Sequence, residues 1–140
     1  MYSQLIHDFI EQESLPESYG QDAIKYFVPL AEKIAKLILK SKGPLLLGIN
    51  GAQGTGKTTL TKLLVRLLEA REFNIASFSI DDFYFTKKER QELAEKEHPM
   101  LITRGVPGTH DIALLLEKLN SLHAQQPGQS VCLPRFNKAL

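Results

Sequence analysis

The chain has 140 residues, of which 43% are hydrophobic and 24% are charged, and its formal net charge is +1. These values are ordinary for a soluble globular protein and predict one domain over residues 1–140. Because the charge is nearly balanced, neither nucleic acid nor a membrane surface is expected as a partner. Cys132 is the single cysteine, which excludes an internal disulfide and a cysteine-based metal cluster. The sequence shows no signal peptide and no membrane-length apolar run, so we expect a cytoplasmic protein.

Residues 1–42 are predicted to form a helical lead-in to a nucleotide-binding core at 43–140. Apolar residues recur at helical spacing up to about Ser14, and again from Phe27 to Ile38. Pro29 lies inside the second pattern, so it predicts either a kink or a helix that begins there. Neither helix carries an obvious chemical group, and both are interpreted as scaffold.

The apolar run at 45–49 predicts a buried strand of a parallel sheet, and a glycine-rich turn follows it directly. Gly51, Gly56, Lys57 and Thr58 satisfy the phosphate-loop pattern G-x-x-x-x-G-K-[ST]. Glycines allow the backbone to approach a phosphate closely, and the N-terminus of the next helix favours an anion. The residues expected to bind the nucleotide are Gly51, Ala52, Gln53, Gly54, Thr55, Gly56, Lys57, Thr58 and Thr59.

Two residues of this loop are expected to act on the phosphates. The Lys57 ammonium supplies a full positive charge to the β- and γ-phosphates, and the Thr58 hydroxyl is placed to coordinate Mg²⁺. A leucine stripe then predicts a helix that packs on the sheet, and residues 75–80 predict a second strand. Strand, helix and strand together predict a βαβ unit with a right-handed crossover.

Two acids follow the second predicted strand, at the sheet edge where open α/β sheets bind ligands. Asp81 can accept a proton from an attacking hydroxyl, or hold the Mg²⁺ shell through water. Asp82 has a similar position, but aspartate is also common where a turn begins. The sequence alone therefore favours a chemical role for Asp81 and leaves that of Asp82 open.

The second half of the chain alternates helices and loops. Thr86 and Glu89 fit a capping box, and the helix after them is polar almost all round, as a mobile flap would be. A loop at 103–111 leads into an amphipathic helix with Thr109 or Asp111 as its N-cap. A short strand is predicted at 131–133.

Three further side chains could contact a substrate. Arg104 precedes a Gly-Val-Pro-Gly loop, and its guanidinium suits bidentate binding of carboxylate or phosphate, although a loop arginine can also be a solvated surface group. His110 could bind substrate or transfer a proton, or could belong to a capping cluster with Asp111. Tyr84, between two phenylalanines, could line a substrate pocket or fill the core.

Three segments, residues 48–60, 79–84 and 104–111, together resemble the D-glycerate 3-kinase-like family of P-loop kinases. That family is similar to the uridine kinase, phosphoribulokinase and pantothenate kinase group, and residues 133–136 look like its next motif. The resemblance implies an α/β P-loop NTPase fold, with three layers around a parallel sheet. It also implies ATP-dependent phosphorylation of a small-molecule hydroxyl with ATP and Mg²⁺, D-glycerate being the leading acceptor.

The resemblance also implies roles for residues of this chain. It maps the catalytic acid onto Asp81, and it implies that Arg104 and His110 face the substrate or the transferred phosphoryl group. Together with the residues above, we expect catalysis by Asp81 and Lys57, Mg²⁺ coordination by Thr58 and Asp81, and substrate binding by Asp82, Tyr84, Arg104 and His110. Members of the family usually carry Asp where this chain has Asn137, and they continue beyond the position of Leu140. The chain therefore resembles the N-terminal half of such a kinase, with a sheet that is incomplete at the C-terminus.

Two alternatives stay open at this stage. One is a truncated ATP-binding remnant that no longer transfers phosphate, and the other is a P-loop ATPase switch that works through partners. A GTPase would need an Asn-Lys-x-Asp motif, and residues 137–140 begin that way but end in Leu. The sequence does not determine the acceptor or the oligomeric state.

Overall fold

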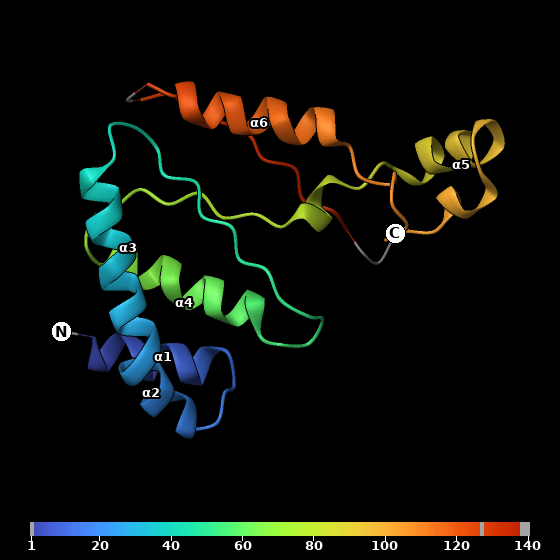
Figure 1. Ribbon diagram of the computed structural model, residues 1–140. Helices are drawn as coiled ribbons and strands as arrows, with labels where there is room; N and C mark the ends of the chain where they lie inside the picture. The colour runs from blue at the N-terminus through green and yellow to red at the C-terminus, as the bar shows by residue number, and fades with distance from the viewer. Residues whose placement is uncertain (1, 127, 138–140) are drawn as a thin grey trace. The chain divides into compact units, whose positions relative to one another are not determined.

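The computed structural model describes residues 2–126 and 128–137 and divides the chain into two compact units, Met1–Ser77 and Phe78–Leu140 (Figure 1). Each unit is built from helices and long stretches without regular secondary structure. The elements of the first unit are α1 (Ser3–Gln12), α2 (Ser18–Asp22), the π-helical turn η1 (Ala23–Phe27), α3 (Val28–Lys40) and α4 (Lys57–Glu69). Those of the second are the 3₁₀ turn η2 (Ile80–Phe83), α5 (Lys87–Lys96), the 3₁₀ turn η3 (Pro99–Ile102) and α6 (Ile112–Ala124).

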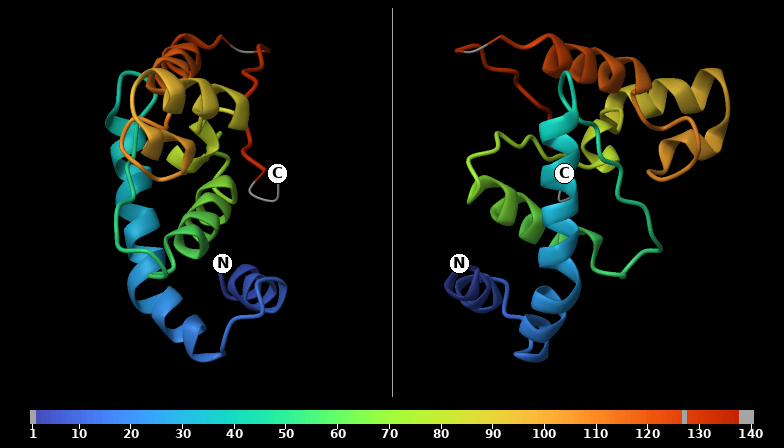
Figure 2. Two further views of the ribbon diagram at one scale, coloured as in Figure 1. Left: turned by 90° about the vertical axis from the view of Figure 1, so that its right-hand side faces the viewer. Right: turned by 60° about the vertical axis from the view of Figure 1, so that its left-hand side comes forward.

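The core of the first unit lies between α1, α3 and α4, and α3 and α4 lie against each other in every view (Figure 2). The predicted leucine stripe of α4 supplies Leu63 and Leu67, both completely buried. Phe9 of α1 and Ala35 of α3 are buried against the same core. The periodicity of the sequence therefore predicted correctly which face of each helix is apolar.

Pro29 stands at the second position of α3, after the π-helical turn η1. A proline has no N–H to donate to the carbonyl four residues earlier, and its ring crowds that carbonyl. The wider π turn accommodates this defect, so the helical path continues from α2 into α3. Because α2, η1 and α3 follow one another without a break, the helix does not begin at Pro29, and an irregularity within a continuous helical path is the closer of the two alternatives.

Two helices of the first unit end in the same left-handed cap. Ser14 after α1 has φ = 51°, and Glu72 after α4 has φ = 64°. In each case the next residue donates a backbone hydrogen bond five residues back, Leu15 to Ile10 and Phe73 to Leu68. These are Schellman motifs, in which an apolar contact usually accompanies the hydrogen bonds.

The predicted strands are not present among the residues that the structure describes. Residues 44–50, 74–79 and 130–137 have no regular secondary structure, so the parallel sheet expected from the sequence is not shown. Leu45, Leu46 and Leu47 are 41%, 72% and 49% exposed. A strand is stabilised by hydrogen bonds to a neighbouring strand, and none pairs with these segments here. The composition of the apolar run fits a strand, but composition does not supply the neighbouring strand that it needs.

The second predicted strand, at residues 75–80, also included a residue of a 3₁₀ turn. Ile80 belongs to η2, because the Ser79 hydroxyl accepts a hydrogen bond from the Asp81 backbone and Asp82 bonds back to the Ser79 N–H. Such a capping box satisfies backbone groups that a strand would direct to its neighbour, so it ends the extended segment before Ile80.

In the second unit, α5 packs against η3 and is held by a buried charge. Arg90 is only 7% exposed, and its Nε donates to the Ile102 carbonyl at 3.2 Å. Both helix caps expected from the sequence form: Thr86 with Glu89 at α5, and Asp111 at α6. The polar helix α5 is therefore anchored to η3, whereas its sequence resembled that of a mobile flap. None of the described helices is long and apolar enough to cross a membrane.

Candidate functional site

The phosphate loop of the first unit is curled around its own lysine. Gly54 and Gly56 have φ = 78° and 81°, a left-handed conformation that suits glycine, and α4 begins immediately at Lys57. The Lys57 ammonium donates to the carbonyls of Gly51 and Ala52, at 2.8 and 2.7 Å. The lysine therefore extends back across the loop and joins its first residues to the start of α4.

The space inside the curl explains the first glycine of the motif. A Cβ on Gly51 would lie 3.1 Å from the Thr55 hydroxyl oxygen, closer than ordinary van der Waals contact. That hydroxyl in turn donates to the Ala52 carbonyl at 2.7 Å. A side chain at position 51 would therefore require the Thr55 hydroxyl to move by a few tenths of an ångström, so the curled loop leaves little room beside Gly51.

The loop leads into a helix N-terminus suited to an anion. The first hydrogen bond of α4 runs from the Leu60 N–H to the Gly56 carbonyl, so the N–H groups of Lys57, Thr58 and Thr59 precede the helical ladder. These donors and the helix dipole favour a phosphate at this end. Thr58 is exposed here, and its hydroxyl is an oxygen donor of the kind that Mg²⁺ accepts. The phosphate loop therefore fits the ATP and Mg²⁺ predicted from the sequence.

In the second unit, η2 presents the two predicted acids, and Asp82 makes several internal contacts. Its Oδ2 accepts from the Ser79 N–H at 2.9 Å and from Arg135 Nη1 at 3.1 Å. Its Oδ1 accepts from the Phe136 N–H at 3.3 Å. The Asp82 side chain is only 13% exposed, whereas that of its partner Arg135 is 69% exposed. Asp82 therefore joins η2 to residues 135–136.

The three other predicted substrate residues are linked by ring contacts: Tyr84 and Arg104 lie against Phe136, and His110 stacks on Tyr84. Tyr84 and His110 stack with ring centroids 4.2 Å apart, and an isolated antiparallel bridge joins their backbones. The Phe136 ring lies edge-on to Tyr84 at 5.3 Å, and the Arg104 guanidinium carbon lies 5.3 Å from the Phe136 centroid. His110 Nε2 is buried and has no hydrogen-bond partner among the residues described. The structure thus brings Tyr84, Arg104 and His110 together.

Phe136 and Arg90 are part of this cluster, although sequence reasoning gave neither a role. The Arg90 guanidinium carbon lies 5.9 Å from the Phe136 centroid, on a helix whose sequence is polar all round. Nothing in that composition distinguishes a buried arginine from a solvated one. Phe136 belongs to the segment 133–136 that resembles a family motif, and this was the one available signal.

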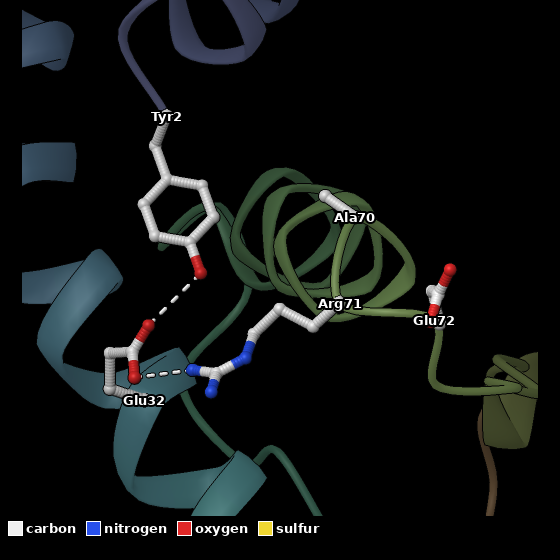
Figure 3. Close-up of a pocket in the computed structure, with 5 residues that line it drawn as sticks. All are labelled: Tyr2, Glu32, Ala70, Arg71 and Glu72. Carbon is white, nitrogen blue, oxygen red and sulfur yellow. Dashed lines mark hydrogen bonds and ion pairs between the residues drawn. The ribbon is translucent and has the colours of Figure 1, made fainter.

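A separate cavity of about 440 Å³ lies at the other end of α4 (Figure 3). The Tyr2 hydroxyl donates to Glu32 Oε1 at 3.0 Å, and Arg71 forms an ion pair with the same carboxylate. The hydrogen bond from Arg71 lowers the pKa of Glu32, and burial followed by the hydrogen bond to Glu32 raises the pKa of Tyr2. These contacts join α1, α3 and the end of α4. Because Arg71 follows the C-terminus of α4 and the phosphate loop precedes its N-terminus, this cavity is not part of the loop.

Comparison with known proteins relates the chain to a family of P-loop domains and to proteins named as kinases. The sequence model of the KAP family P-loop domain matches residues 27–96, which is half of the chain. The uncharacterized kinase mug58 of Schizosaccharomyces pombe is 35% identical over 79% of the chain and 42% of its own length. The chloroplastic D-glycerate 3-kinase of Arabidopsis thaliana is 37% identical over 69% of the chain and 22% of its length. The probable ATP-dependent kinase TDA10 of Saccharomyces cerevisiae is 39% identical over 71% of the chain and 37% of its length.

All three relatives are named as kinases, and the chain spans less than half the length of each.

Proposed function

Since this chain belongs to the glycerate kinase-like family of P-loop kinases, with a KAP family P-loop domain at residues 27–96, we propose that it binds ATP and phosphorylates a small hydroxy acid. D-glycerate is the leading acceptor, because one relative is named as a D-glycerate 3-kinase. The observation that carries the proposal is the curled loop with the Lys57 ammonium across it, next to the N-terminus of α4.

Binding of ATP is assigned to the loop and the first turn of α4. The main-chain N–H groups at the start of α4, those of Lys57, Thr58 and Thr59, would bind the phosphates, and Lys57 adds a full charge that can follow the γ-phosphoryl group during transfer. Mg²⁺ would be held by the Thr58 hydroxyl, which offers an oxygen donor. When bound, the ion neutralises charge on the β- and γ-phosphate oxygens.

Transfer is assigned to residues of the second unit. Asp81 accepts the proton of the acceptor hydroxyl while that oxygen attacks the γ-phosphorus. The bond from the γ-phosphorus to the oxygen bridging it to the β-phosphate breaks, and ADP leaves with that oxygen. Arg104 pairs with the carboxylate of the hydroxy acid, because a guanidinium matches the two oxygens of a carboxylate. His110 and Tyr84 contribute the neighbouring wall of the acceptor site.

A second candidate is an ATP-binding module that transfers nothing by itself. It is favoured by Asn137, where the family resemblance leads to an expectation of Asp. Since such a module would keep the phosphate loop, ATP binding alone does not separate the two candidates. Release of ADP that depends on D-glycerate does separate them.

The test combines ATP binding by calorimetry with an ADP-release assay in the presence of Mg²⁺ and D-glycerate. Lys57→Ala should weaken ATP binding by roughly tenfold to a hundredfold, because it removes a charged donor from the phosphates and the two bonds that hold the loop curled. Lys33→Ala, an exposed lysine of α3, is the matched control and should bind as the wild type does. ATP affinity within a few-fold of wild type in Lys57→Ala would contradict the loop assignment.

A further inference from the structure

We propose that Asp82 and Phe136 are positioning residues that set the guanidinium of Arg104, rather than groups that contact the acceptor. This inference rests on the proposed function for its ligand, a small hydroxy acid whose carboxylate meets Arg104. The residues concerned all belong to the second unit. Asp82, Arg135 and Phe136 are called the Asp82 cluster below.

The Asp82 carboxylate holds residues 135–136 with both of its oxygens. Oδ2 accepts a hydrogen bond from the Arg135 guanidinium at 3.1 Å, and Oδ1 accepts one from the Phe136 N–H at 3.3 Å. Oδ2 also completes the capping box with the Ser79 N–H. A carboxylate with both oxygens in use and 13% of its side chain exposed has little capacity left for a ligand. Its contacts instead fix where the Phe136 ring lies.

The Phe136 ring in turn lies close to two guanidinium groups. The carbon of Arg104 is 5.3 Å from the ring centroid and that of Arg90 is 5.9 Å away. At these distances the negative face of an aromatic ring attracts a guanidinium group. Tyr84, edge-on to Phe136 at 5.3 Å and stacked on His110, limits how far the ring can move.

The two arginines differ in what else they do. Arg90 is buried and donates to the carbonyls of Phe85 and Ile102, so it holds the two stretches that lead to Tyr84 and to Arg104. Arg104 is exposed, which is the condition for meeting a ligand from solution. Arg90 therefore holds the backbone at Phe85 and Ile102, and Phe136 orients Arg104, the arginine that is exposed to solvent.

The first measurement needs no acceptor. In NMR spectra of the full chain, the δ-methylene protons of Arg104, assigned with Arg104→Lys, should show a ring-current shift from Phe136. Phe136→Leu should remove this shift, Phe136→Tyr should keep it, and Asp82→Ala should reduce it. Tyr26→Leu, which removes an exposed aromatic ring from the first unit, is the matched control and should leave it unchanged. An unaltered Arg104 signal in Phe136→Leu would overturn the proposal. Because Phe136→Leu is a conservative change, it tests the proposal even if Asp82→Ala does not fold.

The second measurement is titration with D-glycerate and, separately, with ATP. Phe136→Leu should weaken D-glycerate binding by roughly threefold to tenfold, with recovery in Phe136→Tyr, while ATP affinity stays as in the wild type. Equal weakening of both ligands would indicate a general structural defect and overturn the positioning role. A wild-type chain that shows the ring-current shift but binds no D-glycerate would refute the acceptor proposed above and leave the positioning of Arg104 supported.

Discussion

Replacement of Glu72 by glycine tests whether the C-terminal cap of α4 stores backbone strain. Glu72 follows the helix that begins at the phosphate loop, and its φ of 64° lies in the left-handed region. In that conformation a residue with a Cβ destabilises the folded state by about 1–2 kcal/mol. Glycine avoids this strain but costs about 0.5–1 kcal/mol, because it loses more conformational entropy on folding. Removal of a negative charge from a helix C-terminus adds about 0.3 kcal/mol in the same direction. Glu72→Gly should therefore stabilise the protein by about 0.8–1.3 kcal/mol.

The assay is thermal and urea unfolding of the full chain, followed by circular dichroism. For a protein of this size the gain corresponds to an increase in Tm of roughly 2–6 °C. Ser14→Gly should act in the same direction, because the cap of α1 has the same geometry. Glu69→Gly, at the last residue of α4, should act in the opposite direction, since glycine destabilises a helix by about 1 kcal/mol. If Glu72→Gly lowered Tm as Glu69→Gly does, the strain argument would be wrong.

Three further predictions concern the proton acceptor, the core and the pH dependence of stability. Asp81→Asn should leave ATP affinity within about twofold of wild type and lower the rate of transfer by roughly 10²–10⁴-fold, and an active variant would place the base elsewhere. Leu63→Ala should destabilise by about 2–5 kcal/mol in urea unfolding, because Leu63 is completely buried and the change leaves a cavity; a loss below about 1 kcal/mol would contradict that packing. The pKa of Glu32 is lowered from its ordinary 4.5 by Arg71, so its contribution to stability is present above pH 4.5 and is lost as the pH falls through the lower folded value. Glu32→Gln should therefore lose less Tm than the wild type between about pH 5 and pH 3. If the two proteins lost the same Tm over this range, the ion pair with Arg71 would contribute nothing to stability.

Local features of the fold could be predicted because each depends on residues close together in the sequence. The stripe that contains Leu63 and Leu67 faces the core as its spacing requires, and the capping box of Thr86 and Glu89 forms three residues apart. The loop between Gly51 and Lys57 curls as its glycines allow. In each case a short segment holds all the partners that determine its conformation.

The candidate site could be predicted only in part. The sequence singled out Tyr84, Arg104 and His110 one at a time, as a motif or a residue type. That Tyr84 and Arg104 lie against Phe136 and His110 stacks on Tyr84 could not be predicted from spacing. Arg90 was missed for the same reason, because a buried arginine is distinguished by the carbonyls that receive its hydrogen bonds. Those acceptors are the carbonyls of Phe85 and Ile102, which are five and twelve residues away and lie outside α5.

The sequence by itself determined the phosphate loop, the helix that follows it and the kinase family, since these depend on short segments whose chemistry is complete within them. The tertiary structure decided what Asp82 binds: its carboxylate meets a guanidinium and an N–H more than fifty residues further along the chain. It also decided that residues 45–49 have no strand partner among the described residues. The physical reason is the same in both cases, because a hydrogen bond or a strand pair between distant segments forms only when the fold brings both partners together, and neither segment alone specifies the other.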